Sequence, residues 1–311
     1  MGPWSHGIFR DHCFLGIAAV IFFTMKKFLN RIVTFGRMVK FSHTLFAMPF
    51  ALTSVALASF QFKVTLYKLI WIVIAMVGAR SAAMGFNRIA DRKFDATNPR
   101  TKNREIPANK ISLAEASTFV SVAALVLVFA AYKLNPLCFY LSPVALAVVF
   151  FYSFTKRFTW FSHLFLGLGM GLAPVGAWLG IAGQFELVPI ILGLTVVAWG
   201  AGFDIIYALQ DLEHDEAEGL FSMPKAIGVN KALSISSVLH LVAFALLVSL
   251  RFILPLGEIY TVGLAIIGLI LIYQHRIVKP DDLSKLNLAF FNMNAYLSVG
   301  LFLFTLIDVI K

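Results

Sequence analysis

Nine stretches of this chain are apolar over the length that a helix needs to cross a bilayer, which is roughly 20 residues. They lie at about 41–60, 66–86, 113–132, 137–154, 162–182, 187–206, 232–252, 256–273 and 287–308. Glycine and proline inside these stretches are tolerated in a bilayer, because neighbouring helices satisfy the backbone groups that they leave free. We therefore predict an all-α integral membrane protein, a bundle of nine transmembrane helices.

The composition agrees with a membrane protein and excludes several other classes. Hydrophobic residues make up 59% of the chain and charged residues 14%, against about 45–50% and about 25% in soluble domains. The net charge of +10 is explained by basic membrane loops, so we expect no nucleic-acid partner. Cys13 and Cys138 are the only cysteines and lack a C-x-x-C spacing, which excludes a disulfide framework and a thiolate metal site. We infer no protein partner.

Lysine and arginine are distributed unequally over the loops. The segment 26–40 and the loops after the second, fourth, sixth and eighth stretches hold 19 of them, and the opposite side holds five. Because basic loops remain in the cytoplasm, we expect the N-terminus and these even-numbered loops to be cytoplasmic. The sequence shows no organelle transit peptide, so we expect the inner membrane of a bacterium.

The N-terminal segment needs its own interpretation. Residues 13–25 form a short apolar run followed by Lys26 and Lys27, whereas a signal peptide carries its positive charge before its apolar run. We interpret residues 1–30 as a dispensable N-terminal extension, with a short membrane anchor as the alternative. Residues 31–311 then form a single transmembrane domain.

Ten of the 16 acidic residues fall in the two expected cytoplasmic loops after the second and sixth stretches. The first loop begins with Asn87-x-x-x-Asp91-x-x-x-Asp95, and the second with Tyr207-x-x-x-Asp211-x-x-x-Asp215. Side chains four and eight residues apart share one face of a helix. Each segment therefore predicts an acidic stripe at the point where a membrane helix emerges.

Carboxylates stacked one turn apart repel each other unless a cation lies between them. Oxygen ligands without His or Cys suit a hard cation, and magnesium is usually held by one or two carboxylates while it bridges to substrate phosphates. Two matched stripes on one side of the membrane thus predict Mg²⁺ bound to a diphosphate through Asp91, Asp95, Asp211 and Asp215. Solvated helix ends are the structural alternative.

Basic residues accompany both stripes. Arg100 and Arg104 follow the first stripe, and a second short loop carries Tyr152 together with Lys156 and Arg157. Guanidinium groups bind phosphate oxygens in pairs, and lysine acts as a point charge. We predict that these four cations bind the diphosphate, although a role in membrane topology alone would also explain a single one of them.

The two signatures resemble those of the UbiA superfamily of intramembrane aromatic prenyltransferases. The segment that resembles the family's first signature is Asn87-Arg-Ile-Ala-Asp91-Arg-Lys-Phe-Asp95, followed by Arg100-Thr-Lys-Asn-Arg104. The segment that resembles the second signature is Asp204-Ile-Ile-Tyr207-Ala-Leu-Gln-Asp211-Leu-Glu-His-Asp215. The resemblance is strongest to the 4-hydroxybenzoate polyprenyltransferases. It implies a helical bundle around a central cavity with a lateral opening for the lipid tail. It also implies Mg²⁺-dependent transfer of a polyprenyl group from polyprenyl diphosphate to a ring carbon of a hydroxy-aromatic acid.

Two features depart from the family pattern. Many members have Asp directly after the motif Asn, whereas this chain has Arg88, which cannot bind a metal. The segment 219–224 is similar to a branch that makes menaquinone precursors, so 1,4-dihydroxy-6-naphthoate is the alternative acceptor. Other acceptors used in the superfamily also remain open.

We expect roles for several further residues. Asn87 is expected to orient the metal or the acceptor, and the ring faces of Tyr207, Tyr152 or a phenylalanine to stabilise an allylic cation. Lys40 and His43 could contact the acceptor carboxylate or serve as interfacial anchors. His163, His240 and His275 show no ligand spacing, so we interpret them as packing or interfacial residues.

A membrane transporter with an acidic ion path is the alternative from another functional class. Transporters place their charges near the bilayer midplane, whereas these acidic residues lie at the ends of the apolar stretches. The sequence therefore favours an enzyme. A CDP-alcohol phosphotransferase also uses Asp and Mg²⁺ in a membrane, but the chain lacks the D-G-x-x-A-R segment that such an enzyme needs.

Overall fold

The computed structural model of the chain describes all residues except 1–24, 28, 41–43 and 281. The described residues are almost entirely helical and contain no strand beyond one isolated bridge. His43 and most of the expected N-terminal extension 1–30 lie outside the described residues, so their roles and the domain boundary at residue 31 stay predictions.

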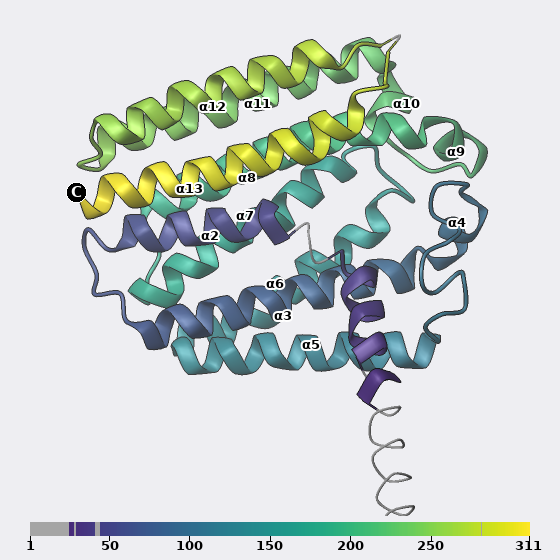
Figure 1. The fold of residues 1–311 in the computed structure, drawn as a ribbon, viewed down its shortest axis with the longest axis horizontal. Coiled ribbons are helices and arrows are strands. Elements are labelled where there is room, and N and C mark those ends of the chain that lie inside the picture. The colour runs from purple at the N-terminus through teal and green to yellow at the C-terminus, as the bar shows by residue number, and fades with distance from the viewer. Residues whose placement is uncertain (1–24, 28, 41–43, 281) are drawn as a thin grey trace, which may run out of the picture.

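Long helices lie side by side and short ones gather at one end of the bundle (Figure 1). The long helices are α2 (Thr44–Ala58), α3 (Leu66–Ala90), α5 (Leu113–Leu134), α6 (Pro136–Thr155), α7 (Ser162–Ala182), α8 (Leu187–Ala208), α11 (Val229–Ile253), α12 (Glu258–Ile277) and α13 (Asn294–Ile310). The short ones are α4 (Arg92–Thr97), the 3₁₀ turn η2 (Leu209–Asp211), α9 (Leu212–Ala217), α10 (Met223–Ile227) and the π-helical turn η3 (Leu288–Met293).

The helical membrane architecture is confirmed. By length and composition, eight of the described helices can cross a membrane, counting α8 with its continuation and η3 with α13. The expected span at 41–60 is the apolar helix α2, which has 15 described residues and is therefore shorter than the other eight. The correction is small, because each of the nine expected stretches contains an apolar helix.

Local sequence signals set several helix boundaries. Ser112 and Glu115 form a reciprocal capping box that begins α5, which satisfies amide groups that the first turn leaves unpaired. Asn135 caps α6, and the next residue, Pro136, needs no amide partner at the first helical position. Gly183 ends α7 with φ 73°, in the left-handed region that glycine adopts without strain.

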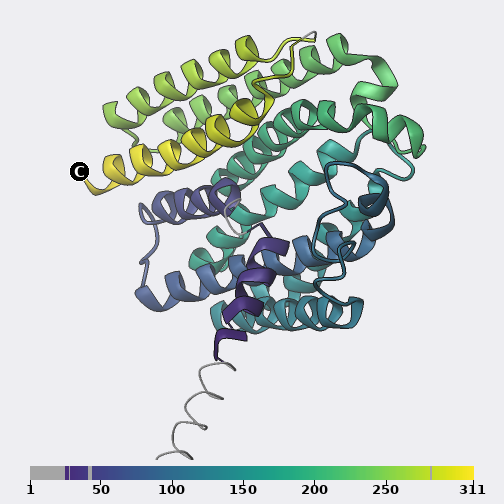
Figure 2. The same ribbon diagram turned by 45° about the vertical axis from the view of Figure 1, so that its right-hand side comes forward.

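The bundle has two groups of helices on either side of a central group (Figures 1 and 2). Helices α3, α5 and α6 pack together on one side and α11, α12 and α13 on the other, with α2, α7 and α8 between them. Helix α8 is the most buried of the candidate spans, with 72% of its apolar window buried. This position makes α8 the central wall of the bundle, which matters because the second acidic segment continues from its end.

Close backbone approach holds α7 against α8. A Cβ on Gly167 would overlap the carbonyl oxygen of Val197, and one on Gly171 would lie 2.8 Å from the carbonyl oxygen of Gly193. Small residues at such positions let membrane helices approach each other, where dispersion forces rather than hydrophobic burial stabilise the contact. The α7–α8 pair is therefore a rigid wall on which the site is built.

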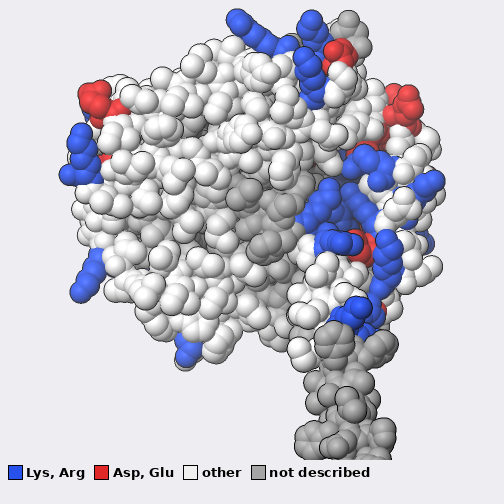
Figure 3. Space-filling model, in the orientation of Figure 1, with Lys and Arg blue, Asp and Glu red and all other residues white. Residues whose placement is uncertain are grey.

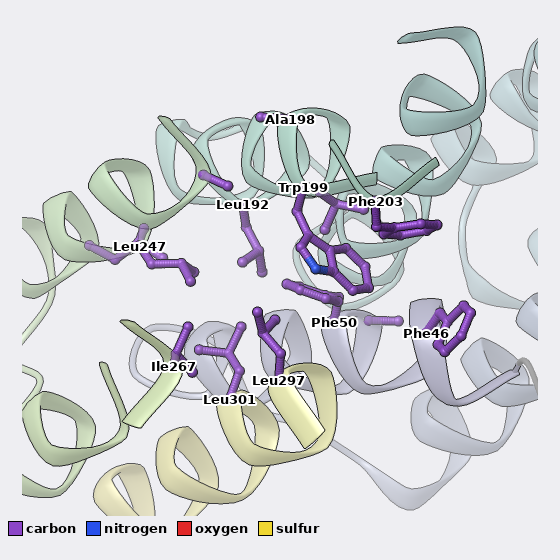
Figure 4. Packing of buried hydrophobic residues seen from close by; sticks show 14 of the residues in the cluster. Phe46, Phe50, Leu192, Ala198, Trp199, Phe203, Leu247, Ile267, Leu297 and Leu301 are labelled. Carbon is purple, nitrogen blue, oxygen red and sulfur yellow. The ribbon is translucent and has the colours of Figure 1, made fainter. Parts of the chain in front are cut away.

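Aromatic side chains fill the core between α2, α8 and α13. Phe50 lies 4.9 Å from Trp199 between ring centroids, and Trp199 lies 4.8 Å from Phe203 (Figure 4). The indole nitrogen of Trp199 donates to Asn294 Oδ1 at 3.0 Å, so the buried polar group is satisfied. Outside this core, large apolar side chains such as Phe252 are exposed, as expected of a surface in contact with lipid.

On the face shown in Figure 3, the charged side chains lie toward the two ends of the molecule. The view in Figure 3 shows an uncharged surface across the middle and a gathering of Lys and Arg at the end that carries α4 and α9. This distribution is typical of a protein whose middle lies in the hydrocarbon core of a bilayer.

Candidate active site

A cavity of about 440 Å³ lies between α3, α6, α7 and α8 and reaches the end of the bundle that carries α4 and α9. Its wall changes in character along its length. The part within the bundle is lined by apolar side chains, among them Ile72, Met76, Leu127, Leu134, Leu141, Met170 and Ala173. The part at the end of the bundle is lined by the charged residues of both acidic segments, so one space joins an apolar channel to a polar chamber.

The first acidic segment bends at Asp91. Helix α3 ends at Ala90 and α4 begins at Arg92, so Asp91 caps one helix and precedes the next. The amide of Asp91 still donates to the carbonyl of Asn87 at 2.9 Å, and that of Asp95 donates to the carbonyl of Asp91 at 2.8 Å. The expected one-turn spacing is therefore kept, but it runs over two helices joined at Asp91 and not along one continuous helix. The Asn87 amide also donates to Asp91 Oδ2 at 2.8 Å.

The second acidic segment follows α8 through a 3₁₀ turn. Asp211 closes this turn, and Asp215 lies on α9, where its side chain is buried. Tyr207 stands at the end of α8, and its ring stacks on Phe290 with 4.0 Å between the centroids. Tyr207, Asp211 and Asp215, which lie before, within and after the 3₁₀ turn, all line the cavity.

Each of the four predicted metal-binding carboxylates forms an ion pair with a different predicted phosphate-binding cation. The pairs are Asp211 with Arg100 at 2.6 Å, Asp95 with Arg104 at 2.6 Å, Asp215 with Lys156 at 3.4 Å and Asp91 with Arg157 at 3.5 Å. The Arg100 pair is bidentate, with Nε also donating to Asp211 Oδ1 at 2.9 Å, the strongest geometry for such a pair. The two sets of residues predicted from sequence are thus brought together and neutralise each other.

Burial disfavours the charged form of the carboxylate at the bend. Burial first, and then the charge of Asp95, raises the pKa of Asp91 to about 6, while Arg157 and Lys156 oppose the shift. Loss of hydration and repulsion from Asp95 both disfavour a negative charge on Asp91. A cation in the chamber would relieve this repulsion.

The chamber offers oxygen ligands of the kind that Mg²⁺ prefers. Among the described residues, no three His, Cys, Asp or Glu side chains form a ready-made metal cluster. However, Asp95 Oδ2 is buried without any hydrogen-bond partner, and an orphaned anionic oxygen of this kind fits a missing cation. Carboxylates spread around a chamber also fit Mg²⁺, which commonly takes one or two protein ligands and completes its shell with phosphate and water.

Arg88, which stands where many family members have Asp, lines the cavity and is bound to the backbone of the segment before α2. Its side chain is buried, and Nε donates to the carbonyl of Met38 at 3.2 Å. Arg88 therefore fixes the segment before α2 against the end of α3. Lys40, which adopts φ 46°, lies in this segment and lines the cavity. Burial first, and then Arg88, Arg104 and Arg100, lower the pKa of Lys40 to about 8.

Arg80 is a cavity residue that the analysis of sequence patterns missed. It lies inside α3, seven residues before Asn87, and both line the cavity. Its Nε is buried without a hydrogen-bond partner, and the side chain forms no ion pair with any described residue. Its position within an apolar stretch could have identified it, because an arginine inside a membrane span usually has a functional role.

His163 is a second residue that was interpreted differently. The sequence predicts a packing or interfacial role, but the side chain is completely buried and Nδ1 lies 2.7 Å from Asp204 Oδ2. Asp204 in turn lines the cavity. His240 and His275 pair with each other at 2.8 Å between α11 and α12 and do not line this cavity, so their packing interpretation agrees with the structure.

Comparisons with known proteins show which family the chain resembles. The sequence matches the UbiA prenyltransferase family over residues 47–296. A 4-hydroxybenzoate octaprenyltransferase from Vibrio atlanticus is 31% identical over 238 residues, which cover 76% of this chain and 84% of the relative. Another from Alkalilimnicola ehrlichii is 32% identical, covering 78% of this chain and 82% of the relative.

Solved structures of UbiA homologs have the same fold. The apo structure of a UbiA homolog from Aeropyrum pernix K1 matches with a TM-score of 0.78 and 31% identity, over 86% of this chain and 98% of that one. A UbiA homolog from Archaeoglobus fulgidus, bound to DMAPP and Mg²⁺, matches with a TM-score of 0.67 and 20% identity, over 88% of this chain and 99% of that one. The chain belongs to the UbiA prenyltransferase family, as an enzyme embedded in the membrane.

Proposed function

We propose that this protein transfers a polyprenyl group from polyprenyl diphosphate to a ring carbon of 4-hydroxybenzoate, with Mg²⁺ as cofactor, in ubiquinone biosynthesis. The observation that carries the proposal is the cavity, which joins an apolar channel, an arginine with no ion-pair partner among the described residues, and a chamber of paired charges. These three parts match a lipid tail, an aromatic carboxylate and a diphosphate. Relatives named 4-hydroxybenzoate octaprenyltransferase support this acceptor.

The diphosphate binds in the chamber by exchanging partners. Arg100, Arg104, Lys156 and Arg157 are each held by a carboxylate in the structure. When a diphosphate arrives, these cations turn to its oxygens, and the released carboxylates become available to the metal. Mg²⁺ held by Asp91, Asp95, Asp211 and Asp215 supplies positive charge that stabilises the departing diphosphate. The UbiA homolog from Archaeoglobus fulgidus that is bound to DMAPP and Mg²⁺ supports this cofactor.

The polyprenyl tail lies in the apolar channel, and the acceptor lies between the channel and the chamber. A charged guanidinium without an anionic partner is unfavourable in a low-dielectric cavity. Arg80 lacks such a partner among the described residues, and the carboxylate of 4-hydroxybenzoate supplies one. Lys40, on the wall of the same cavity, is a second cation for this carboxylate.

The reaction begins when the allylic C–O bond breaks and its electrons leave with the diphosphate. Tyr207 and Tyr152 line the cavity, and their ring faces stabilise the allylic cation. The Arg100 guanidinium carbon lies 5.2 Å from the Tyr207 ring centroid, which supports a role for this ring beside a cation. The ring carbon ortho to the phenol then bonds to the allylic carbon, and the same ring carbon loses its proton.

The chain's own contribution is a dry and preorganised site. The apolar channel keeps water away from the cation, which water would otherwise capture. The four cations already lie around the chamber before the substrate binds, each paired with a carboxylate, so binding exchanges partners within the site and does not have to assemble it. The match to a prenyltransferase family argues against transport, the alternative function from another class.

The test is prenyl transfer in membranes of cells that express the chain. Membranes receive Mg²⁺, a radiolabelled polyprenyl diphosphate and either 4-hydroxybenzoate or 1,4-dihydroxy-6-naphthoate. We expect labelled product with 4-hydroxybenzoate and at least about 100-fold less with Asp215→Asn, because a charged partner of the chamber is lost. Labelled product with the naphthoate alone would overturn the acceptor, and product with neither would overturn the proposed function.

Glu216→Gln is the matched control for the acidic variant. Glu216 neighbours Asp215 on α9, is exposed and does not line the cavity. Its substitution removes one negative charge from the same helix, so activity within about twofold of the parent is expected for a solvated surface charge. An equal loss in both variants would mean that the charge of α9, and not the carboxylate of Asp215 in the chamber, determines activity.

A further inference from the structure

The protonation of His163 is fixed by its surroundings. Nε2 accepts a hydrogen bond from the backbone amide of Met223 at 3.3 Å, and Nδ1 lies 2.7 Å from Asp204 Oδ2. A backbone amide can only donate, so Nε2 carries the lone pair and Nδ1 carries the proton. His163 is therefore a neutral imidazole that donates its Nδ1–H to the Asp204 carboxylate.

Asp204 differs from the other carboxylates of the cavity. Asp91, Asp95, Asp211 and Asp215 each pair with a lysine or arginine, whereas in the described part of the chain Asp204 has only the neutral donor His163. Its side chain is 14% exposed and lines the cavity one helical turn before Tyr207. Because no lysine or arginine forms an ion pair with Asp204 among the described residues, the orientation of its carboxylate in the cavity depends on the His163 Nδ1–H.

His163 also connects this carboxylate to the loop that closes the chamber. Met223 is the first residue of α10, and the preceding segment donates from Leu220 N to the carbonyl of Asp215 at 2.9 Å and from Phe221 N to the carbonyl of Lys156 at 2.7 Å. The two ring nitrogens thus serve two separate structures. One orients Asp204 on α8, and the other holds the loop whose amides donate to the backbone carbonyls of Asp215 and Lys156, the two members of an ion pair of the chamber.

We propose that His163 is a positioning residue for prenyl transfer, which acts by holding the Asp204 carboxylate in the cavity through its Nδ1–H. The inference rests on the proposed function, because it assigns Asp204 to the same reaction. Hydrogen-bond partners that orient a functional carboxylate or ligand commonly change activity by about 10- to 100-fold when they are replaced. If His163 served only to hold Met223, its replacement would lower the stability of the protein and would not lower kcat.

Two substitutions separate these two contacts. His163→Asn keeps an amide N–H near the position of Nδ1 and loses the acceptor for Met223. His163→Gln keeps an amide oxygen near the position of Nε2 and loses the donor for Asp204. We expect His163→Gln to lower kcat about 10- to 100-fold with KM for both substrates changed by less than about threefold, and His163→Asn to retain most of kcat.

A double-mutant comparison tests whether His163 acts through Asp204. If it does, His163→Gln has no further effect on kcat in the Asp204→Ala background, because residues that act as a unit are not additive. His240→Gln is the control for loss of a buried histidine, since His240 is buried but lies away from the cavity. Thermal unfolding in detergent shows whether each variant is folded.

Three results would overturn the inference. They are normal kcat in His163→Gln, an equal loss of kcat in His163→Asn and His163→Gln, and a further loss of kcat on adding His163→Gln to Asp204→Ala. Failure of the parent chain to transfer any prenyl group would instead contradict the proposed function. The two failures are therefore distinguishable within one set of assays.

Discussion

Replacement of Arg80 by leucine tests the assignment of the acceptor site. Arg80 is the cavity arginine whose Nε is buried without a hydrogen-bond partner. In the proposed complex its guanidinium binds the acceptor carboxylate, and hydrogen bonds to charged groups contribute about 1.5–3 kcal/mol each. Loss of the pair is expected to weaken acceptor binding by about 2–4 kcal/mol, which corresponds to a rise in KM of roughly 30- to 900-fold.

The same substitution is expected to stabilise the protein. An unsatisfied buried polar group costs about 1–3 kcal/mol, and leucine fits the neighbouring channel wall of Met76 and Met84. We expect the free energy of unfolding to rise by about 1 kcal/mol, which is roughly 2 °C in Tm for a chain of this size. A loss of activity together with a gain in stability is typical of a residue retained for function.

The assay is steady-state prenyl transfer in purified membranes with the acceptor varied. KM for polyprenyl diphosphate is expected to change by less than about twofold, because the diphosphate binds the other cations of the chamber. 4-Hydroxybenzamide, which lacks the carboxylate charge, should be a poor acceptor for the parent and an equally poor one for Arg80→Leu. Arg251→Leu, at the far end of α11 and outside the cavity, is the control. An acceptor KM within threefold of the parent value would refute the assignment.

Further predictions concern pH, packing and metal dependence. Lys40 has its pKa lowered to about 8 by burial first and by neighbouring arginines, so the folded protein disfavours its charged form. The resulting destabilisation is present below about pH 8 and is relieved between about pH 8 and the ordinary lysine pKa of about 10.4, so Tm of the parent should rise over this range relative to Lys40→Met. If Lys40 binds the acceptor carboxylate, the acceptor KM should also rise above about pH 8, and Lys40→Arg should remove this dependence. Gly167→Ala, whose Cβ overlaps the Val197 carbonyl oxygen, should destabilise the protein by about 1–3 kcal/mol in thermal unfolding, whereas Gly176→Ala, with open space around it, should not. Asp211→Asn should raise the Mg²⁺ concentration for half-maximal activity at least about tenfold, and a normal magnesium titration would contradict its role as a ligand.

The helical architecture could be predicted because it depends on local patterns. Apolar stretches of membrane length, caps such as Ser112 with Glu115, and the turn at Gly183 act over a few residues, and they set where helices begin and end. The bend at Asp91 could not be predicted, because the four-residue spacing continues through it. A periodic pattern predicts which side chains share a face of a helix, and it does not predict where one helix ends and the next begins.

The residues missed by pattern analysis were those that act singly. Arg80 and His163 belong to no spaced motif, and each gains its meaning from what surrounds it in the fold. Arg80 is informative because no described carboxylate neutralises it, and His163 because a backbone amide from α10 fixes its tautomer. Both are tertiary facts, so no inspection of neighbouring residues in the sequence could have established them.

The charge pairing in the chamber explains why carboxylates and cations occur together at this site. Four carboxylates that faced a membrane-embedded cavity alone would repel each other and lower the stability of the fold. Four cations in one-to-one pairs remove most of this repulsion, and the side-chain exposures of 2% to 36% leave most of the pairs only partly in contact with water. A prenyl diphosphate with Mg²⁺ offers each group a new partner of opposite charge, so binding exchanges ion pairs and does not create unpaired ones. The residues that stabilise the substrate-free protein are therefore the same residues that we assign to diphosphate binding, and variants in the chamber should lower stability and activity together, unlike Arg80→Leu.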